Sequence, residues 1–315
     1  KHPGAELVGI CDLPGFKFPD EITSTIPVFS SAEEFLFQTQ ADVINVCTPN
    51  YLHHVHTLLA LEQKKHVVCE KPMAISTVDC MAMIEASNKA NKHLFIVKQN
   101  RFNPPVAAVK QAIEDGKFGK IYSVQLSCFW NRNKDYYENS WKGTQDLDGG
   151  TLFTQFSHFV DLLYWLIGDV RRAFALTNNF AHKEIIDFED TGAVALEFYN
   201  GAIGTINYTV NSYNKNMEGS LTIFAEKGTV KIGGQYLNEL EYQNIEGFEF
   251  KDLPEGKGPN NYGNYVGSMS NHDKIYQNLI DVLQKGDSIA TNSFEALKTV
   301  EIIDKIYQSA KQLNN

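Results

Sequence analysis

Apolar and polar positions alternate in two distinct ways along the chain, and the change falls after residue 118. In the first part, short β-branched runs alternate with longer stretches of helical periodicity. Ser76, with Asp79 three residues later, predicts a capped start for one of these helices. This alternation is typical of a parallel sheet wrapped by helices, so we expect an α/β, Rossmann-type domain. The predicted strands are 6–11, 42–47, 66–69 and 93–97, and the predicted helices are 52–65, 76–91 and a third from Pro104 to about Gly116.

Longer alternating strands dominate the rest of the chain. Turns such as Asn200-Gly201 and Lys227-Gly228 favour antiparallel pairing. We therefore predict a dinucleotide-binding domain over 1–118 and an α+β domain with an open, mainly antiparallel sheet over 119–315. For the last helix, 294–313, packing against the first domain is a second possibility. The predicted strands are 120–130, 191–199, 202–212 and 220–225, and the predicted helices are 152–167, 272–284 and 294–313.

Composition narrows the possible functions. A chain of 315 residues suits two domains. Its net charge of -10 opposes nucleic-acid binding. No apolar run approaches the roughly 18 residues of a membrane span, and no signal-peptide pattern begins the chain. The five cysteines form no CxxC pair, which argues against a disulfide framework or zinc ribbon. We expect a cytoplasmic protein without nucleic-acid or membrane partners.

The end of the first predicted strand carries Asp12, in a position where dinucleotide folds place an acid on the ribose hydroxyls. An ordinary turn before Leu13-Pro14-Gly15 is the other interpretation. The phosphate-binding glycines should lie about 20 residues earlier, but no GxGxxG occurs in the sequence. Either the chain begins after its own Gly-rich turn, or no dinucleotide binds here. If a cofactor binds, Asp12 favours NAD over NADP, because its charge repels a 2′-phosphate.

The next strand ends in Thr48-Pro49-Asn50, with His53 at the start of the following helix. Pro49 lacks a backbone donor and stops the strand, which leaves Thr48 and Asn50 facing the ligand-binding edge of the sheet. His53, His54 and His56 also raise the possibility of a metal site. No Cys, Asp or Glu follows within a turn to complete one, so we expect no metal.

Strand 66–69 runs into Glu70-Lys71-Pro72. A lysine at the end of a buried strand is costly unless it has a function. A surface ion pair with Glu70 is an equally good explanation from burial alone. Because Asp12, Thr48-Pro49-Asn50 and Lys71 all end strands at one edge, we favour a functional lysine.

At this point the chain resembles the Gfo/Idh/MocA family of NAD(P)-dependent oxidoreductases. The resemblance implies a Rossmann domain, hydride transfer at a sugar carbon, and a homodimer or homotetramer formed through the open sheet. It also implies that the Gly-rich first turn is missing from this chain. The residues that carry it are Val46–Asn50 with His53, Cys69–Pro72, and Asp148-Gly149-Gly150 leading into His158, Asp161, Trp165 and Gly168.

A finer likeness is to the branch of the family that oxidises the C3 hydroxyl of UDP-N-acetylglucosaminuronic acid. It rests on Gln99–Asn103, Phe129-Trp130, Tyr136-Tyr137 and Trp141–Thr144. Together with the strand ends, it implies that the cofactor is held by Asp12, Thr48, Pro49, Asn50, His53, Glu70, Lys71, Pro72 and Gln99. The implied substrate-binding residues are Asn100, Arg101, Tyr137, Trp141, Lys142, Gln155 and His158.

On the predicted helix 152–167, Thr154, His158, Asp161 and Trp165 recur at helical spacing and form one stripe. A core histidine satisfied by Asp161 or by a backbone group is the plain alternative to a catalytic one. We predict His158 as the base, able to act without any pKa shift, and Lys71 as the group that positions the hydroxyl, although these roles can be exchanged. The resemblance places Thr154 with Lys71 and His158 among the catalytic residues. Thr154 stands where the family usually has an aspartate, which puts a simple Asp-His dyad in doubt.

Arg101 follows strand 93–97, and its planar fork suits a carboxylate or phosphate. The alternative is an ion pair across the domain junction. Tyr137, Trp141 and Lys142 lie in a loop, where the aromatic rings either stack on a sugar or uracil or cap the core.

Three other functions remain open at this stage. They are a dehydrogenase of free aldoses or inositols, a glycosidase that retains NAD, and a sugar-binding protein without activity.

Overall fold

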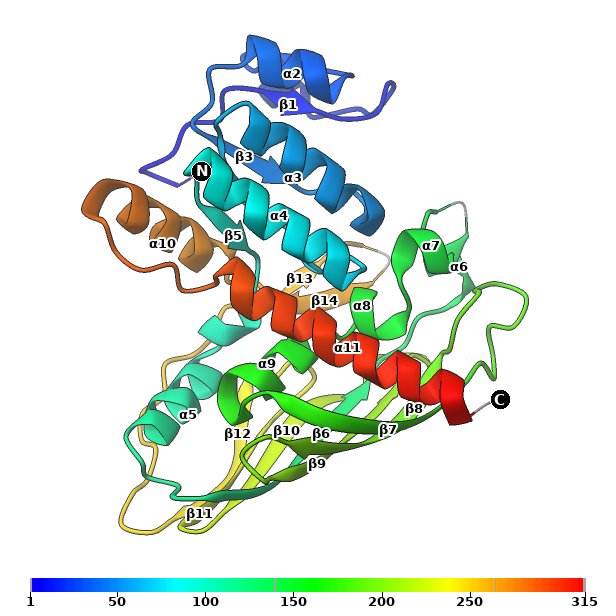
Figure 1. Ribbon diagram of the computed structural model, residues 1–315, viewed down its shortest axis with the longest axis vertical. Coiled ribbons are helices and arrows are strands. Elements are labelled where there is room, and N and C mark those ends of the chain that lie inside the picture. The colour runs from blue at the N-terminus through cyan, green and yellow to red at the C-terminus, as the bar shows by residue number, and fades with distance from the viewer. Residues whose placement is uncertain (1, 139, 264, 314–315) are drawn as a thin grey trace.

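The computed structural model describes residues 2–138, 140–263 and 265–313, and it stacks a small parallel sheet above a large one (Figure 1). The small sheet has the order β3-β4-β5 and contains parallel strands only. Val67 and Val68 of the central strand are both almost inaccessible, as expected where helices cover a sheet on both faces. Its strands are β3 (Val43–Val46), β4 (His66–Cys69) and β5 (Leu94–Ile96), and the connecting helices are α3 (His53–Glu62) and α4 (Thr77–Ala90). Ser76 caps α4 as predicted, accepting a hydrogen bond from the Asp79 amide at 3.1 Å.

The first residues form a separate parallel pair, β1 (Ile10–Cys11) with β2 (Val28–Phe29). Strand β1 is much shorter than the predicted 6–11, because Leu7 and Val8 are exposed and have no neighbouring strand. Two helices in this region, α1 (Asp20–Thr23) and α2 (Ala32–Gln38), were not predicted. Their apolar stripes are too weak to detect, since only Leu36 of α2 is buried.

The large sheet has seven strands in the order β12-β11-β10-β6-β9-β8-β7. All neighbours are antiparallel except β6 and β9, so the prediction of an open, mainly antiparallel sheet is confirmed. The sequence pattern did not predict β7, β11 and β12, or a short hairpin of β13 (Pro259–Asn261) with β14 (Val266–Met269). The strands are β6 (Ile121–Phe129), β7 (Val170–Asn178), β8 (Thr191–Phe198), β9 (Ile203–Thr209), β10 (Glu218–Ala225), β11 (Gly228–Gly233) and β12 (Glu239–Ile245).

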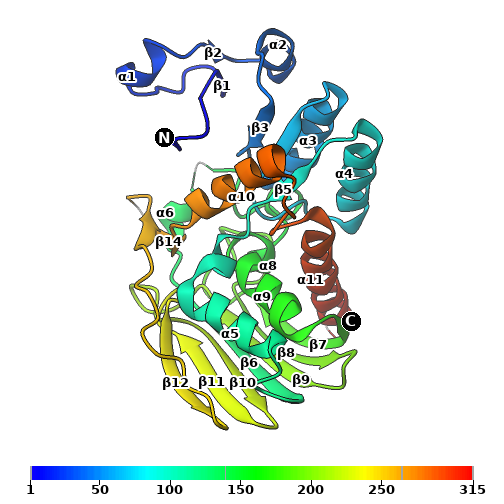
Figure 2. The ribbon, with the colours of Figure 1, turned by 90° about the vertical axis from the view of Figure 1, so that its left-hand side faces the viewer.

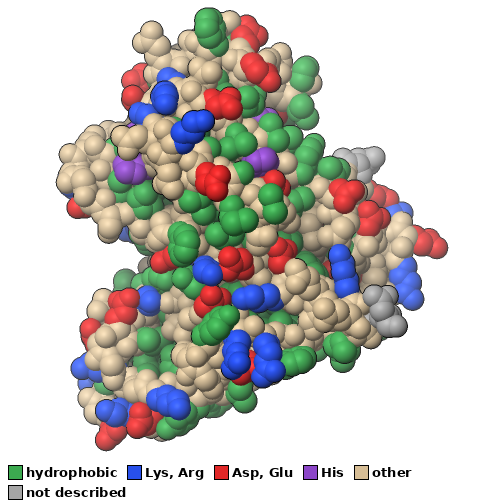
Figure 3. Space-filling view, viewed as in Figure 1, with side chains coloured by type: hydrophobic (Ala, Val, Ile, Leu, Met, Phe, Trp, Pro, Cys, Tyr) green, Lys and Arg blue, Asp and Glu red, His purple; other side chains and the backbone are tan. Residues whose placement is uncertain are grey.

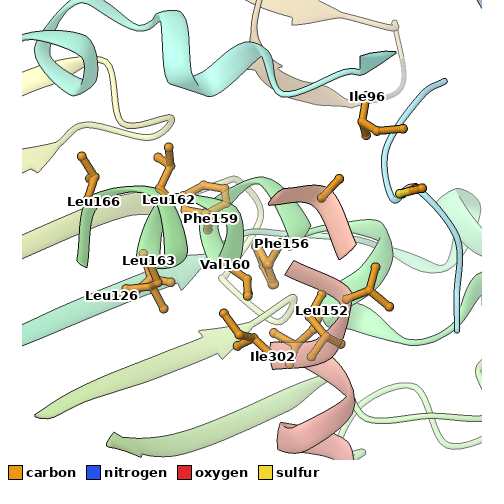
Figure 4. Close-up of a cluster of buried hydrophobic side chains, with 14 of the residues drawn as sticks. Ile96, Leu126, Leu152, Phe156, Phe159, Val160, Leu162, Leu163, Leu166 and Ile302 are labelled. Atoms are coloured by element: carbon orange, nitrogen blue, oxygen red, sulfur yellow. The ribbon is translucent and has the colours of Figure 1, made fainter. Parts of the chain in front are cut away.

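Helices cover one face of the large sheet and leave the other face bare (Figure 2). The covering elements are α5 (Pro104–Glu114), α8 (Thr151–Thr154), α9 (Ser157–Ile167) and α11 (Ser293–Leu313). Figure 4 shows the core that results, with Phe159, Leu163 and Ile302 among its members. On the bare face, Phe174, Leu176 and Ile203 are 55%, 65% and 60% exposed.

The predicted helix 152–167 is two helices. Gln155 and Phe156 separate α8 from α9, and Phe156 has the non-helical torsions φ -119° and ψ 9°. Its ring packs against Trp130, Phe159 and Tyr208, so burial of this side chain offsets the lost helical turn. Thr154 and His158 therefore do not share a continuous helical stripe, contrary to the prediction.

The last two helices join the two parts. Helix α10 (His272–Lys285) packs Ile275 and Leu279 against Val68 and Phe95 of the parallel sheet, although the predicted division assigned it to the second domain. Helix α11 contacts α4 on one side and α9 and β7 on the other. No helix within the described residues is long and apolar enough to cross a bilayer. On the face seen in Figure 3, acidic and basic side chains are interspersed.

Candidate active site at the domain junction

Asn50 is the first contact between the strand ends of the parallel sheet and the second part of the molecule. It begins the 3-10 turn η1 (Asn50–Leu52) directly after β3 and is 5% exposed. Its Nδ2 donates to the Asp148 carbonyl at 2.9 Å and to Thr154 Oγ1 at 3.0 Å. The carboxyl end of β3 is thereby hydrogen-bonded to α8 and to α7 (Gln145–Asp148).

Lys71, after β4, reaches the same place. Its Nζ donates to the Thr154 carbonyl at 2.9 Å. Burial lowers the pKa of this lysine, while the charges of Glu70 and Asp148 oppose the shift. Glu70 instead lies 3.3 Å from His272 Nε2, so the suggested surface ion pair between Glu70 and Lys71 is absent.

His158 lies at the start of α9 and is 2% exposed. Neither ring nitrogen has a hydrogen-bond partner among the described residues. Burial, followed by repulsion from Lys71 and Lys98, holds the pKa of His158 well below its ordinary value. Two expectations are corrected here: the imidazole does not titrate unshifted, and Asp161 does not satisfy it.

Gln99 and Asn100 also contain buried atoms without partners. They lie in η2 (Gln99–Phe102), a 3-10 turn after β5 that packs against α9. Gln99 Oε1 and both side-chain atoms of Asn100 make no hydrogen bond within the described chain. An unpaired buried polar atom costs about 1–3 kcal/mol. These atoms and the His158 ring lie on two elements that pack together, and such unpaired buried groups are exceptions in a folded protein that call for an explanation such as a bound polar ligand.

Arg101 does not face this site as a free cation. Its Nε and Nη2 donate to the two carboxylate oxygens of Asp161 at 2.8 and 2.7 Å, and Nη1 bonds Glu295 of α11. The side chain is almost fully buried. Of the two predicted roles, the structure therefore shows the ion pair across the junction, and Arg101 as a substrate-binding residue is corrected.

The loop before α7 contains three of the residues predicted to bind substrate. Tyr137, in α6 (Lys134–Tyr137), is 5% exposed and packs with Ile186 and Phe188. It caps the core, and its predicted stacking on a sugar is corrected. Lys142 Nζ lies 4.9 Å from the Tyr136 ring centre and 5.3 Å from that of the half-buried Trp141.

Two residues of this region were not predicted as functional. Asp148 is 1% exposed, and its Oδ2 accepts a hydrogen bond from the Gly143 amide at 2.8 Å. Burial raises the pKa of Asp148 to about 7, against the opposing charges of Lys142 and Lys71. Arg132 is 3% exposed and donates to Gln155 Oε1 at 2.7 Å. The only sequence signal was the position of Arg132 just beyond the end of β6 and of Asp148 in Asp-Gly-Gly.

Two of the predicted cofactor segments lie at the carboxyl ends of adjacent strands, since Val46 of β3 pairs with Cys69 of β4. Thr48-Pro49-Asn50 and Glu70-Lys71-Pro72 thus leave the sheet side by side. Asp12 follows β1, which pairs with β2 in a separate sheet, so the expectation that Asp12 ends a strand at the same sheet edge as Asn50 and Lys71 is wrong. Its Oδ1 accepts the Leu13 amide at 2.7 Å, which forms the local turn. The ends of β3 and β4, together with the unpartnered atoms of Gln99 and Asn100 in η2, offer polar groups at the edge where parallel sheets bind dinucleotides.

The three histidines near η1 have separate partners. The ring nitrogens of His53 lie 2.6 Å from the Pro72 carbonyl oxygen and 2.8 Å from that of Thr48. His54 pairs with Asp79 and His56 with the Thr48 hydroxyl. His53 therefore acts as a brace between the two strand ends.

Comparison with known proteins identifies the family. Residues 1–98 match the family described as an oxidoreductase family with an NAD-binding Rossmann fold, and residues 106–231 match the Gfo/Idh/MocA C-terminal domain. The crystal structure of the WlbA dehydrogenase from Bordetella pertussis, in complex with NADH and UDP-GlcNAcA, is 37% identical. It aligns with a TM-score of 0.85 over 97% of this chain and 88% of that one.

Two curated relatives are more distant. A 2,7-anhydro-N-acetylneuraminate hydratase from Escherichia coli is 29% identical over 69% of this chain and 61% of its own length. A myo-inositol 2-dehydrogenase from Thermotoga maritima is 27% identical over 64% of this chain and 59% of its own length. The matches thus span less than two thirds of these relatives. Family profiles over both parts and the structural likeness to the Bordetella dehydrogenase agree: the chain belongs to the Gfo/Idh/MocA family of oxidoreductases.

Proposed function

We propose that this protein oxidises a secondary hydroxyl of an acidic nucleotide sugar, transferring hydride to NAD. The preferred substrate is a UDP-N-acetyl-hexosaminuronic acid, oxidised at C3. The observation that carries the proposal is the buried His158 ring, which has no partner in the described chain and lies close enough to Lys71 for its pKa to be lowered by that charge. The relative solved with NADH and UDP-GlcNAcA supports this substrate class.

In this proposal His158 and Lys71 share the proton chemistry. A histidine with a lowered pKa is neutral near neutral pH and accepts the hydroxyl proton. Lys71, held by the Thr154 carbonyl, orients the same hydroxyl. Thr154 acts through Lys71 and Asn50 rather than on His158, which explains why a carboxylate is not required at this position. NAD, when bound at the strand ends, supplies the hydride acceptor.

The cofactor residues in the proposal are Asp12, Thr48-Pro49-Asn50, Glu70, Pro72 and Gln99, with His53 as the brace. Asp12 keeps one carboxylate oxygen outside its local turn bond, and this charge favours NAD over NADP. Asn100, Trp141, Lys142 and Gln155 remain candidates for substrate contacts.

An inositol or free-aldose dehydrogenase is the second candidate, supported by the Thermotoga relative. A purified sample mixed with NAD and a panel of UDP-GlcNAcA, UDP-GlcNAc, myo-inositol and glucose separates the two through the absorbance of reduced nicotinamide. We expect turnover only with the acidic nucleotide sugar. Turnover only with inositol or glucose would move the protein to the second class. Sugar release without net reduction would identify an NAD-retaining glycosidase, and binding without turnover a sugar-binding protein.

The proposal includes assembly and location. The bare face of the large sheet, with Phe174, Leu176 and Ile203, suits a homodimer or homotetramer contact. A cytoplasmic location agrees with five cysteines that are all free thiols.

A further inference from the structure

We propose that Arg132, assisted by Lys142, binds the acidic group of the substrate. This inference rests on the proposed function, because it names the residue that makes the site selective for an anionic sugar. The sequence had pointed to Arg101 for this task, but Arg101 is neutralised by Asp161 and Glu295.

The Arg132 guanidinium has more donors than its partners among the described residues use. Nε donates to Gln155 Oε1 at 2.7 Å, and Nη1 donates to the Asn131 carbonyl at 2.7 Å and to Asn216 Oδ1 at 3.2 Å. An arginine carries five N–H donors. Among the described residues only Nε and Nη1 have acceptors, which leaves the two donors on Nη2 without a partner there.

Neutral groups, rather than acids, surround this arginine. Its guanidinium carbon lies 5.0 Å from the Trp130 ring centre and 5.2 Å from those of Tyr136 and Tyr265. No carboxylate among the described residues comes within ion-pair distance of it. Burying a cation without a counter-charge is expensive. The aromatic rings hold the guanidinium plane in place, and an incoming anion would complete its neutralisation.

Lys142 adds a second positive charge. Its Nζ lies over the same Tyr136 ring. Burial first, and then repulsion by Arg132, lowers the pKa of Lys142, while Asp148 opposes the shift. Lys71 also experiences repulsion from Arg132. Asp148 faces Lys142 and Lys71, and burial raises its own pKa to about 7. A chain with a net charge of -10 thus has a local excess of positive charge here.

Gln155 links this anion site to the reacting groups. It accepts from Arg132 and donates to the Tyr136 hydroxyl at 2.8 Å. In the chain it follows Thr154, whose carbonyl holds Lys71. Arg132 and Lys71 are therefore held by two neighbouring residues, Gln155 and Thr154. This arrangement suits a sugar that carries its acidic group and its reacting hydroxyl on the same ring.

Two parts of a nucleotide sugar carry the required charge, the ring carboxylate and the diphosphate, and we favour the carboxylate. The test compares kcat/KM of Arg132→Gln and Arg132→Lys with the native protein, using UDP-GlcNAcA and the neutral UDP-GlcNAc. Arg171→Gln is the matched control, since Arg171 is an exposed arginine on β7. A hydrogen bond to a charged group is worth about 1.5–3 kcal/mol. We therefore expect Arg132→Gln to lower kcat/KM for the acid by about 10- to 150-fold and to change KM more than kcat.

The outcomes separate the possibilities. A loss confined to UDP-GlcNAcA supports the carboxylate, with Arg132→Lys retaining part of the activity. Equal losses for both sugars, with weaker inhibition by UDP, assign Arg132 to the diphosphate instead. If Arg132→Gln folds and behaves like Arg171→Gln with both sugars, the inference is overturned.

Failure of the proposed function is distinguishable from failure of this inference. In that case the native protein does not oxidise UDP-GlcNAcA, and Arg132 is tested by calorimetric binding of UDP and of D-glucuronate. Loss of either affinity in Arg132→Gln, whose thermal unfolding checks its folding, supports the anion site. Unchanged affinities reject it.

Discussion

Arg101 and Asp161 meet through two parallel hydrogen bonds of 2.7 and 2.8 Å in the interior of the domain junction. Thr299 of α11 also donates to this carboxylate, and Lys98 lies 3.4 Å from it. One ion pair therefore joins the parallel sheet, α9 and α11. The charges of Arg101 and Lys98 outweigh burial and hold the pKa of Asp161 well below its usual range.

Removing one member of this pair should destabilise the junction. We expect Arg101→Leu to lower the free energy of unfolding by about 3–5 kcal/mol, because Asp161 would remain buried with less compensation. Urea denaturation measures the loss, and the double variant Arg101→Leu/Asp161→Leu should recover part of it. If Arg101→Leu is as stable as the native protein and loses affinity only for acidic sugars, Arg101 binds substrate and its structural role is contradicted.

Lys71→Ala and His158→Ala should each lower kcat by about 10²- to 10⁴-fold, the usual contribution of a positioned proton-transfer group. Steady-state kinetics measure the loss, and quenching of protein fluorescence by NADH checks that the cofactor still binds. His93→Ala, at an exposed histidine, is the control. Full turnover in either variant would exclude that residue from the chemistry.

Glu189 should make stability depend on pH. Its Oε1 accepts hydrogen bonds from Tyr307 and Tyr208 at 2.7 and 3.0 Å, and burial raises its pKa to about 7. The stabilisation is complete below the ordinary pKa of 4.5 and is lost as pH rises through about 7. Ionisation of Glu189 should lower the free energy of unfolding by up to about 3 kcal/mol between pH 4.5 and about 7. Glu189→Gln should remove this slope in urea unfolding, whereas the exposed Glu246→Gln should keep it. An unchanged slope in Glu189→Gln would contradict the assignment.

The bare sheet face provides a test of assembly. Leu176→Glu places a charge on this face, on the edge strand β7, and should convert an oligomer to monomers in sedimentation velocity. Phe37→Glu, at an 87% exposed position on α2, should leave the assembly unchanged. A native protein that sediments as a monomer would remove the sheet as a contact surface.

Strand and helix periodicity determined the fold class of both parts. Short β-branched runs between helices bury their apolar faces as a parallel sheet covered by helices, and long alternating runs with Gly turns do so as an antiparallel sheet. The same pattern located the strand ends, and with them Asn50 and Lys71 at one edge. It did not detect β7, β11, β12 or the interruption between α8 and α9. A strand such as β7 exposes apolar residues on its free face, and Phe156 leaves the helix only because Trp130 and Tyr208 make room for its ring.

Tertiary structure alone decided which of several equivalent side chains are free to act. From residue type, Arg101 and Arg132 are equal candidates for binding an anion, and Asp161 and Asp148 are equal candidates as the acid near His158. Only long-range contacts pair Arg101 with Asp161 and Glu295, leave Arg132 beside aromatic rings, and place Asp148 against Asn50. The physical reason is that charge and hydrogen-bonding capacity are properties of a residue, whereas their neutralisation depends on partners that folding brings from distant parts of the chain.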